Sequence, residues 1–440
     1  MAIQGSLVSG EAGIHQALEY TGLSINAFPV ELLTEIFLLC RSTGRKSDPS
    51  TPTLANIISV CRYWRSIALE LPYLWSTIAL YDPRDQHARM VEQWLTRSKA
   101  CPLTLIVRHA EDSAPDATQK IITLAMKHLR RWKKVLFSFL SVESITSLSD
   151  LPADPTAAPA LEHVEISTGT CFDPEVTTKF WESIFTYPSA RRTIWTSPDI
   201  DDITYFPCIP GDHWERLTHI TAPFVLDDDL LDCLSRCNAL EVLQIEDLID
   251  ATCPLRPRES ITLPSLHTFK ARGEGTVINR LLDYLTLPSV HDLDANLLFG
   301  GGLQSWIDLF HRSSCHLSRM KVILDEETSE KELHSLLSSS SMTELEGLCA
   351  AFYGMDTILV QKLICTTDNA ILPILERLEL RLVSCEDGLL SRMMESRRAS
   401  LKYVDIVHYP PGYGNRSPST DSAYFSRFSQ PGTTVSYRGV

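Results

Sequence analysis

The sequence lacks the features that mark secreted and membrane proteins. Its 12 cysteines include no C-x-x-C pair and no dense, short framework, so we expect reduced and mostly buried thiols rather than disulfides. No stretch approaches the roughly 18 apolar residues of a membrane-spanning helix. The first 27 residues contain no apolar run of signal-peptide length. The chain is therefore expected in the cytoplasm, the nucleus or both, without a membrane partner.

Positive charge is also scarce. The 440 residues carry 40 lysines and arginines against 55 aspartates and glutamates, a formal net charge of −15. Nucleic-acid binding needs clustered cations that displace counterions from phosphates, so this balance argues against a nucleic-acid partner. The length exceeds what one compact core serves, which predicts two or three domains or one elongated repeat array.

Catalytic and cofactor motifs are missing as well. The sequence has no G-x-S-x-G, no G-x-x-x-x-G-K-[ST], no H-E-x-x-H and no G-x-G-x-x-G that opens a helix. The run Gly300-Gly301-Gly302 lacks the Lys and the Ser or Thr of a phosphate loop, which favours a flexible loop. We therefore predict a non-catalytic protein without a cofactor.

Two groups of metal-ligand residue types have simpler interpretations. Cys233 and Cys237 are four residues apart on an expected helix, but no His or second Cys pair stands at ligand spacing, which favours buried cysteines. The run 227–229 consists of three aspartates, which favours a helix N-terminus, where acidic side chains complement the dipole, over a hard-cation site. No metal site is predicted.

Two helical stripes lie near the N-terminus. Apolar residues recur at helical spacing between Phe28 and Phe37, and again between Leu54 and Ala68. Bulky apolar residues follow at 71–75. Short helices within about 50 residues bury too little surface for a stable core of their own. This block is therefore expected to pack against a partner.

The rest of the chain repeats a short pattern, L-x-x-φ-x-φ, in which φ is apolar or alanine. Clear copies begin at Leu161, Leu217, Leu240, Leu266, Val290, Leu317, Leu345, Leu375 and Leu401. Weaker copies begin at Pro102, Trp132 and Arg191, so the twelve copies span about eleven turns from the first to the last. Each copy alternates like a strand, and segments between copies, such as 228–237 and 277–285, have helical spacing. One strand and helix cannot bury their own apolar face, so stacked copies are needed to build a core.

The predicted fold class is α/β: an N-terminal three-helix domain followed by an irregular repeat solenoid of parallel short strands with helical returns. The expected boundaries are an N-terminal extension at 1–25, the three-helix domain at 26–78, a linker helix at 79–100 and the solenoid at 101–407. Residues 408–440 are rich in Pro, Gly, Ser and Tyr without apolar periodicity, which predicts a disordered tail.

The N-terminal block resembles an F-box. The segments V-C-R-x-W-R at 60–65 and P-x-L-W-S at 72–76 look most like the F-box-like proteins abundant in mushroom-forming fungi. The solenoid is similar to the leucine-rich repeats that follow many F-boxes. Two departures are clear: Phe28 replaces the usual leading Leu, and the insert between the helical stripes is long. The repeats also lack an Asn ladder, so an irregular solenoid is expected.

The resemblance implies a substrate-recognition subunit of an SCF-type (Skp-cullin-F-box) ubiquitin ligase. The F-box would bind a Skp-type adaptor and, through it, a cullin-RING ligase, while the repeats would bind an unknown protein substrate. The residues that match the adaptor-binding positions are Pro29, Leu32, Leu33, Ile36, Val60, Cys61 and Trp64. The alternative for Leu33, Ile36, Cys61 and Trp64 is that they only pack the small helical domain. The alternative function is a repeat scaffold, or an adaptor-binding interaction protein, outside any ligase.

Polar residues between the apolar template positions are expected on the exposed face of the sheet. Opposite charges alternate there between neighbouring strands, an arrangement that either neutralises itself or selects a protein target. The candidate substrate-facing residues are Gln244, Glu246, Lys270, Arg272, Asp292, Asp294, Arg319 and Lys321.

Overall fold

The computed structural model describes residues 28–42, 51–108, 115–139, 147–168, 174–197, 203, 205–251, 253–298, 300–324, 330–352, 356–365, 371–408, 420–428 and 430–439. The chain divides into two compact units. Unit 1 extends to Trp75 and includes Arg97–Lys99, and unit 2 consists of Ser76–Thr96 and the chain from Ala100 onward.

Unit 1 is helical, with α1 (Val30–Ser42), α2 (Thr51–Val60), α3 (Arg62–Glu70) and a short 3-10 helix, η2 (Pro72–Trp75). The continuous second helix expected over 54–68 is wrong, because Cys61 divides it. Cys61 has extended backbone angles and caps α3, with its Sγ accepting a hydrogen bond from the Trp64 amide at 3.4 Å. Two helices therefore replace one.

The end of unit 1 is anchored by Trp75, whose side chain is buried. Its indole Nε1 donates a 2.9 Å hydrogen bond to the carbonyl of Ala68, and the Arg97 guanidinium lies 4.4 Å from the ring centroid. The indole hydrogen bond ties η2 to the last turn of α3. The bulky apolar run at 71–75 thus supplies one buried anchor, Trp75.

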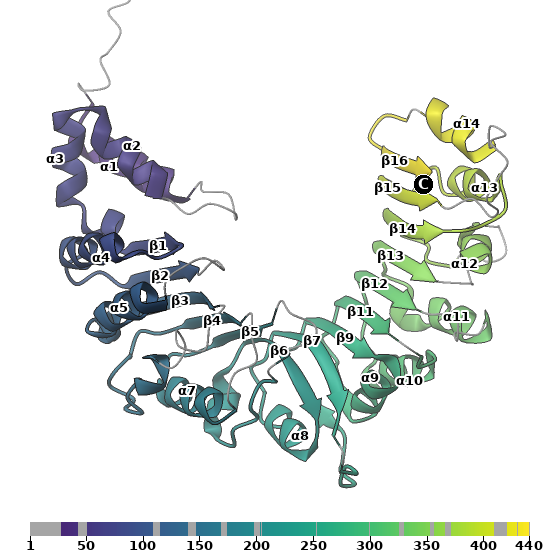
Figure 1. The fold of residues 1–440 in the computed structure, drawn as a ribbon. Coiled ribbons are helices and arrows are strands. Elements are labelled where there is room, and N and C mark those ends of the chain that lie inside the picture. Colours follow the sequence, from purple (N-terminus) through teal and green to yellow (C-terminus); the bar gives the residue numbers. More distant parts are fainter. Residues whose placement is uncertain are drawn as a thin grey trace, which may run out of the picture. The chain divides into compact units, whose positions relative to one another are not determined.

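Unit 2 contains a parallel sheet of 14 strands in which spatial order follows chain order. Figure 1 shows the strands following one another in sequence, with the helices along one side of them. The strands are β1 (Thr77–Tyr81), β2 (Leu103–Arg108), β3 (Trp132–Phe139), β4 (His163–Thr168), β5 (Arg192–Thr196), β6 (His219–Leu226), β7 (Val242–Asp250), β9 (Thr268–Glu274), β11 (Asp292–Leu298), β12 (Arg319–Leu324), β13 (Gly347–Phe352), β14 (Arg377–Val383), β15 (Tyr403–His408) and β16 (Thr434–Gly439). This arrangement confirms the predicted α/β class and has the pattern of a leucine-rich-repeat-like solenoid.

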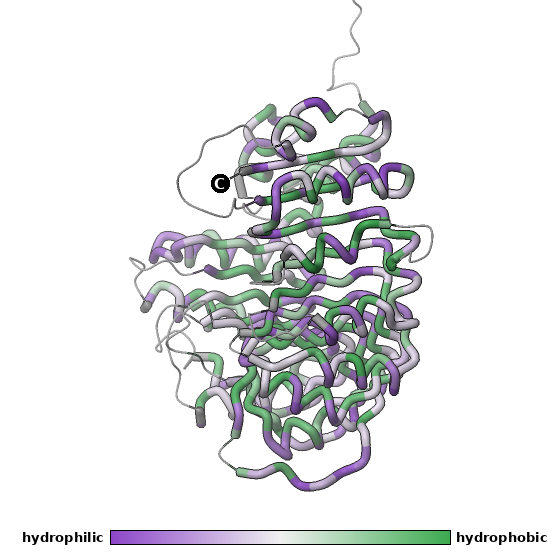
Figure 2. Tube along the Cα trace, turned by 90° about the vertical axis from the view of Figure 1, so that its right-hand side faces the viewer, coloured by the Kyte–Doolittle hydropathy of each residue, from purple (hydrophilic) through white to green (hydrophobic). Residues whose placement is uncertain are grey.

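Helices return the chain from most strands to the next. They are α4 (Asp85–Arg97), α5 (Pro115–Met126), α7 (Pro174–Thr186), α8 (Asp228–Leu234), α9 (Gly275–Asp283), α10 (Gln304–Ser313), α11 (Glu330–Leu337), α12 (Asp356–Leu363), α13 (Leu389–Ser396) and α14 (Thr420–Arg427). Short 3-10 turns add η3 (Leu129–Arg131), η4 (Ser147–Asp150), η5 (Asp212–Arg216) and η6 (Ser340–Met342), and β8 (Ile261–Thr262) pairs with β10 (Leu285–Thr286). Polar and apolar stretches follow one another along the tube in Figure 2, as alternating burial requires.

The register follows the sequence template. The residue two positions after each clear template start pairs with its counterpart in the next strand, as in His219 with Val242 and Asp292 with Arg319. The weak copy expected at Arg191 is displaced by one residue, because Arg192 rather than Thr193 occupies that row. Its true buried positions are Ala190, Thr193 and Trp195.

Two expected boundaries are wrong. The segment assigned to a linker helix, 79–100, contains most of β1 before α4, so the parallel sheet begins before residue 101. The C-terminal segment is not uniformly disordered, because α14 is a helix and β16 pairs with β15 along its whole length. Residues 409–419 of the expected tail lie outside the described residues. The tail adds one more strand to the sheet because Val435 and Tyr437 continue the β15 register.

Four arginines join successive repeats of unit 2. Each donates side-chain hydrogen bonds to backbone carbonyls 25 to 36 residues earlier, including a carbonyl in the last turn of the preceding helix. These arginines are Arg131, Arg216, Arg312 and Arg397. Carbonyls at a helix C-terminus have no hydrogen-bond partner within the helix and carry partial negative charge. A guanidinium supplies the missing donors and a compensating positive charge.

The glycine run at 300–302 forms a close backbone contact rather than the expected flexible loop. Gly300 and Gly301 have positive φ angles of 86° and 94°. A Cβ on Gly275, the first residue of α9, would lie 1.6 Å from the carbonyl oxygen of Gly300. Two neighbouring repeats therefore approach through glycine backbone alone.

A buried histidine in unit 2 makes stability depend on pH. His213 is 7% exposed and stacks on Phe185, with ring centroids 4.0 Å apart. Burial, with a smaller contribution from Arg216, lowers the pKa of His213 to about 4. Between the ordinary pKa of about 6.5 and the folded value, the unfolded chain binds more protons, so acidification destabilises the fold.

We expect His213→Phe to reduce this pH sensitivity. From pH 7 to pH 5 the wild type should lose about 2 kcal/mol more of unfolding free energy than the variant. Urea unfolding at both pH values measures the difference, and His311→Phe, at an exposed position of α10, is the control. Equal pH dependence in wild type and His213→Phe would show that His213 does not cause the effect.

Candidate partner-binding surfaces

Exposed apolar side chains are concentrated in unit 1. Ten large apolar residues are exposed among the described residues, and seven of them belong to the helices of unit 1. These seven are Val30, Leu32, Leu39, Val60, Tyr63, Leu69 and Tyr73. The helical core itself is small, with Leu33, Phe37, Ile57, Ile67, Ala68, Leu74 and Trp75 buried. Unit 1 thus presents much of its apolar surface outward.

The residues predicted to bind an adaptor are spread over different degrees of burial. Pro29, Leu32 and Val60 are exposed, with exposed fractions of 49% for Leu32 and 54% for Val60. Ile36 and Cys61 are half-buried. These side chains are accessible to a partner, and their role in binding one stays a prediction.

Two members of the predicted set pack inside unit 1. Leu33 is 0% exposed, so it belongs to the core and not to an accessible surface. Trp64 is half-buried, and its ring centroid lies 4.9 Å from that of Phe37. The packing alternative therefore holds for Leu33, and it holds in part for Trp64. The Trp64 Nε1 is shielded from solvent and makes no hydrogen bond within the described residues.

The sequence pattern missed several exposed apolar positions. Leu39, near the end of α1, and Tyr73, in η2, are 63% and 57% exposed. Leu39 could have been found from its helical spacing, because it lies off the stripe that contains Leu33 and Phe37. Tyr73 carries no such signal, because it lies in a short turn.

The predicted charge alternation on the sheet of unit 2 is largely present. Asp294 and Lys321 pair at 2.9 Å, and Asp292 and Arg319 lie 3.6 Å apart. All eight predicted substrate-facing residues are exposed or half-buried. Exposed pairs of this kind contribute at most about 1 kcal/mol each, which favours the self-neutralising interpretation for these four residues.

One predicted pair does not follow the expected register. The template spacing predicts Glu246 beside Arg272, but the pairing of β7 with β9 ends at Ile245 and Ala271. The Glu246 carboxylate instead accepts a hydrogen bond from the Gln244 side chain. Arg272 is exposed, and Lys270 lies opposite both Gln244 and Asp294 in the sheet.

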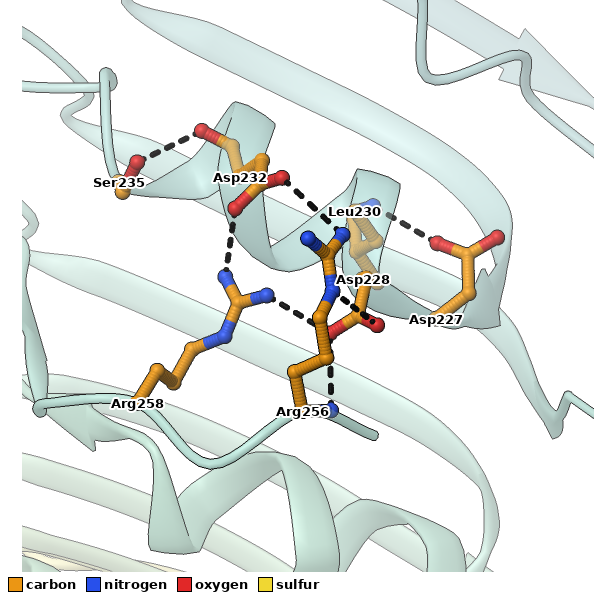
Figure 3. Close-up of polar contacts among 7 residues, drawn as sticks. All are labelled: Asp227, Asp228, Leu230, Asp232, Ser235, Arg256 and Arg258. Carbon is orange, nitrogen blue, oxygen red and sulfur yellow. Dashed lines mark hydrogen bonds and ion pairs between the residues drawn. The ribbon is translucent and has the colours of Figure 1, made fainter. Parts of the chain in front are cut away.

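Aspartates of the acidic run 227–229 are engaged in contacts within the protein. Asp227 caps α8, with its Oδ1 accepting from the Leu230 amide at 2.7 Å. Figure 3 shows Arg256 and Arg258 reaching from a following segment to Asp228 and Asp232. Asp228 lies 2.8 Å from both guanidinium groups, and Arg256 lowers its pKa. The helix N-terminus interpretation is confirmed, with two arginines supplying the counter-charge.

The described residues contain no group of three or more His, Cys, Asp or Glu side chains arranged to hold a metal ion. Cys233 and Cys237 are both buried, and burial raises the pKa of the Cys237 thiol. The Cys237 Sγ donates to the carbonyl of Cys233 at 3.4 Å. The buried-cysteine interpretation is therefore confirmed for this pair. In the described part of the chain, no helix has the length and apolar character needed to cross a membrane.

Comparison with known proteins gives little further guidance. No protein-family model matches the chain, and no curated protein matches it. Among the solved structures that match is the yeast complex of Rad7 and Elc1, with 12% identity, 92% of each chain covered and a TM-score of 0.35. Similarity at this level assigns the chain to no family.

Proposed function

We propose that this chain is a non-catalytic substrate-recognition subunit of an SCF-type ubiquitin ligase. Unit 1 binds a Skp-type adaptor, which links the chain to a cullin-RING ligase, and unit 2 binds a protein target. The observation that carries the proposal is that seven of the ten exposed large apolar side chains in the described residues belong to the few helices of unit 1. Apolar helical surface of this kind is suited to a groove on a partner protein.

The F-box-like segments lie at the positions that support this assignment. Val60 ends α2 and Cys61 caps α3, so the V-C-R-x-W-R segment forms a helix junction with Val60 exposed. The P-x-L-W-S segment forms η2 and supplies the buried Trp75. The motif thus combines one structural anchor, Trp75, with one apolar residue that is accessible to a partner, Val60.

Unit 2 supports the second half of the proposal through its size and its open face. Outward side chains of 14 adjacent strands form an extended surface, because core residues alternate with them along each strand. A target held there would be brought close to the transfer machinery. The resulting increase in effective concentration needs no chemistry from this chain.

Reconstitution with purified components tests the proposal. The full chain is mixed with the Skp-type adaptor and a cullin from its own organism and analysed by size-exclusion chromatography. We expect the chain to co-elute with the adaptor, and with the cullin only when the adaptor is present. Failure to bind the adaptor would overturn the proposal. Adaptor binding without cullin recruitment would replace it with the non-ligase scaffold.

A further inference from the structure

A cavity of about 680 Å³ lies at the N-terminal edge of the sheet in unit 2. It is lined by residues near the N-terminal ends of β2 to β7. They are Thr104, Lys133, Lys134, Glu162, His163, Arg191, Arg192, Thr218 and Glu241. None of these residues belongs to the charge alternation between β7 and β12 described above, so the cavity is a separate surface.

The strand register places basic side chains next to one another in this cavity. Lys134 lies opposite His163 in the next strand, His163 opposite Arg192, and Arg192 opposite His219. Side chains at paired positions of neighbouring parallel strands are about 4.8 Å apart at their backbones. Four basic or titratable groups therefore stand in one row across β3 to β6.

The acidic groups near this row leave part of its charge unpaired. Glu162 lies 3.6 Å from the Lys133 ammonium, and Glu165 lies 3.5 Å from the Nε2 of His163. Within the described residues, no carboxylate lies within 4.0 Å of the cationic groups of Lys134, Arg191 or Arg192. The cavity thus contains three cations without a carboxylate within salt-bridge distance, although Glu165 interacts with Lys134 over a longer range.

In the C-terminal half of the sheet, by contrast, several cationic side chains have carboxylate partners. There Arg319 and Lys321 meet Asp292 and Asp294, and Arg438 meets Asp405 at 3.2 Å. Neighbouring like charges repel, so an anion that binds between these three cations relieves part of their repulsion. Arginine forks match the oxygens of a phosphate or carboxylate group, and Thr104 adds a hydroxyl group to the lining.

We propose that this cavity binds an oxyanion group, a phosphate or a carboxylate, carried by a peptide segment of the target, with Arg191, Arg192 and Lys134 as its cationic contacts. Glu162 and Glu241 in the same lining disfavour a long polyanion, so a nucleic acid is a contrary outcome of the test. The proposal extends the proposed function by giving the chemistry of the target. Its test omits the adaptor, so the two proposals can fail separately.

Fluorescence anisotropy with three labelled peptide pools tests the site. The pools have mixed sequences around a central phosphoserine, glutamate or serine, and the full chain is titrated into each. We expect the phosphoserine or the glutamate pool to bind at least about tenfold more tightly than the serine pool. The better pool identifies the source of the oxyanion, and excess inorganic phosphate should compete with it.

Two double variants complete the experiment. Arg191→Gln/Arg192→Gln changes exposed side chains and should weaken binding of the better pool at least about tenfold. Arg319→Gln/Lys321→Gln removes two cations that already have carboxylate partners and should change it less than about twofold. Equal binding of all three pools, unchanged binding by the first variant, or tighter binding of a single-stranded oligonucleotide would overturn the proposal.

Discussion

Replacing Arg397 with Met is expected to destabilise the C-terminal repeats of unit 2 by about 3–5 kcal/mol. Arg397 is 2% exposed, and its guanidinium donates to the carbonyls of Leu363, Ile371 and Leu372. Methionine fills similar volume but removes the guanidinium donors of three buried carbonyls, and of these the Leu372 carbonyl keeps the 3.4 Å bond from the Leu375 amide. Each unsatisfied buried acceptor costs about 1–3 kcal/mol. This loss of hydrogen-bond stabilisation is larger than the hydrophobic stabilisation that the buried methionine adds.

Amide hydrogen exchange in β14 and β15 measures this effect at the repeats concerned. Arg398→Met is the matched control, because Arg398 is exposed and lies 3.6 Å from Glu395 at the surface. The control should change the opening free energy by less than about 1 kcal/mol. If both variants exchange alike, the carbonyl contacts of Arg397 do not hold the repeats together.

Gly275→Ala is expected to cost about 3–5 kcal/mol of local stability, because no side chain fits between the two repeats. The new methyl group would lie 1.6 Å from the Gly300 carbonyl oxygen, which is backbone and cannot rotate away. The clash can be relieved only if α9 moves from the segment that follows β11. Faster hydrogen exchange in β9 and β11 should report that separation.

Gly347→Ala is the matched control, because the space around Gly347 can accommodate a methyl group. Its added methyl would meet the Arg319 side chain at 3.4 Å, an ordinary contact, and its backbone is extended within β13. We expect a change within about 1 kcal/mol, because alanine also restricts the unfolded chain. Similar losses for both substitutions would argue against the close-approach explanation.

The repeat register could be predicted because buried leucines mark it strongly. In the repeat whose buried positions are Ala190, Thr193 and Trp195, the predicted template start is wrong by one residue. Small and polar residues at buried positions do not match the apolar template. The last strand was missed for a related reason: Gly, Pro and Ser dominate the segment before it, which conceals the short β16. Composition averaged over 30 residues cannot resolve a six-residue strand.

For the candidate sites too, some features could be predicted from local sequence patterns and others could not. The exposed Leu32 and Val60 follow from the motif, but the burial of Leu33 depends on how three helices pack against one another. The basic cavity joins residues from Thr104 to Glu241. Only the assembled register places them side by side, because no local pattern links residues so far apart in sequence.

The central claim is that the exposed apolar surface of unit 1 binds a Skp-type adaptor, and calorimetric titration of the full chain with that adaptor tests it most directly. We expect Leu32→Asp/Val60→Asp, which places charges at two exposed positions, to weaken binding at least about tenfold. Ile374→Asp, at a 45% exposed apolar position of unit 2, should bind like the wild type. Wild-type affinity in the double variant, with its helical content unchanged, would contradict the account.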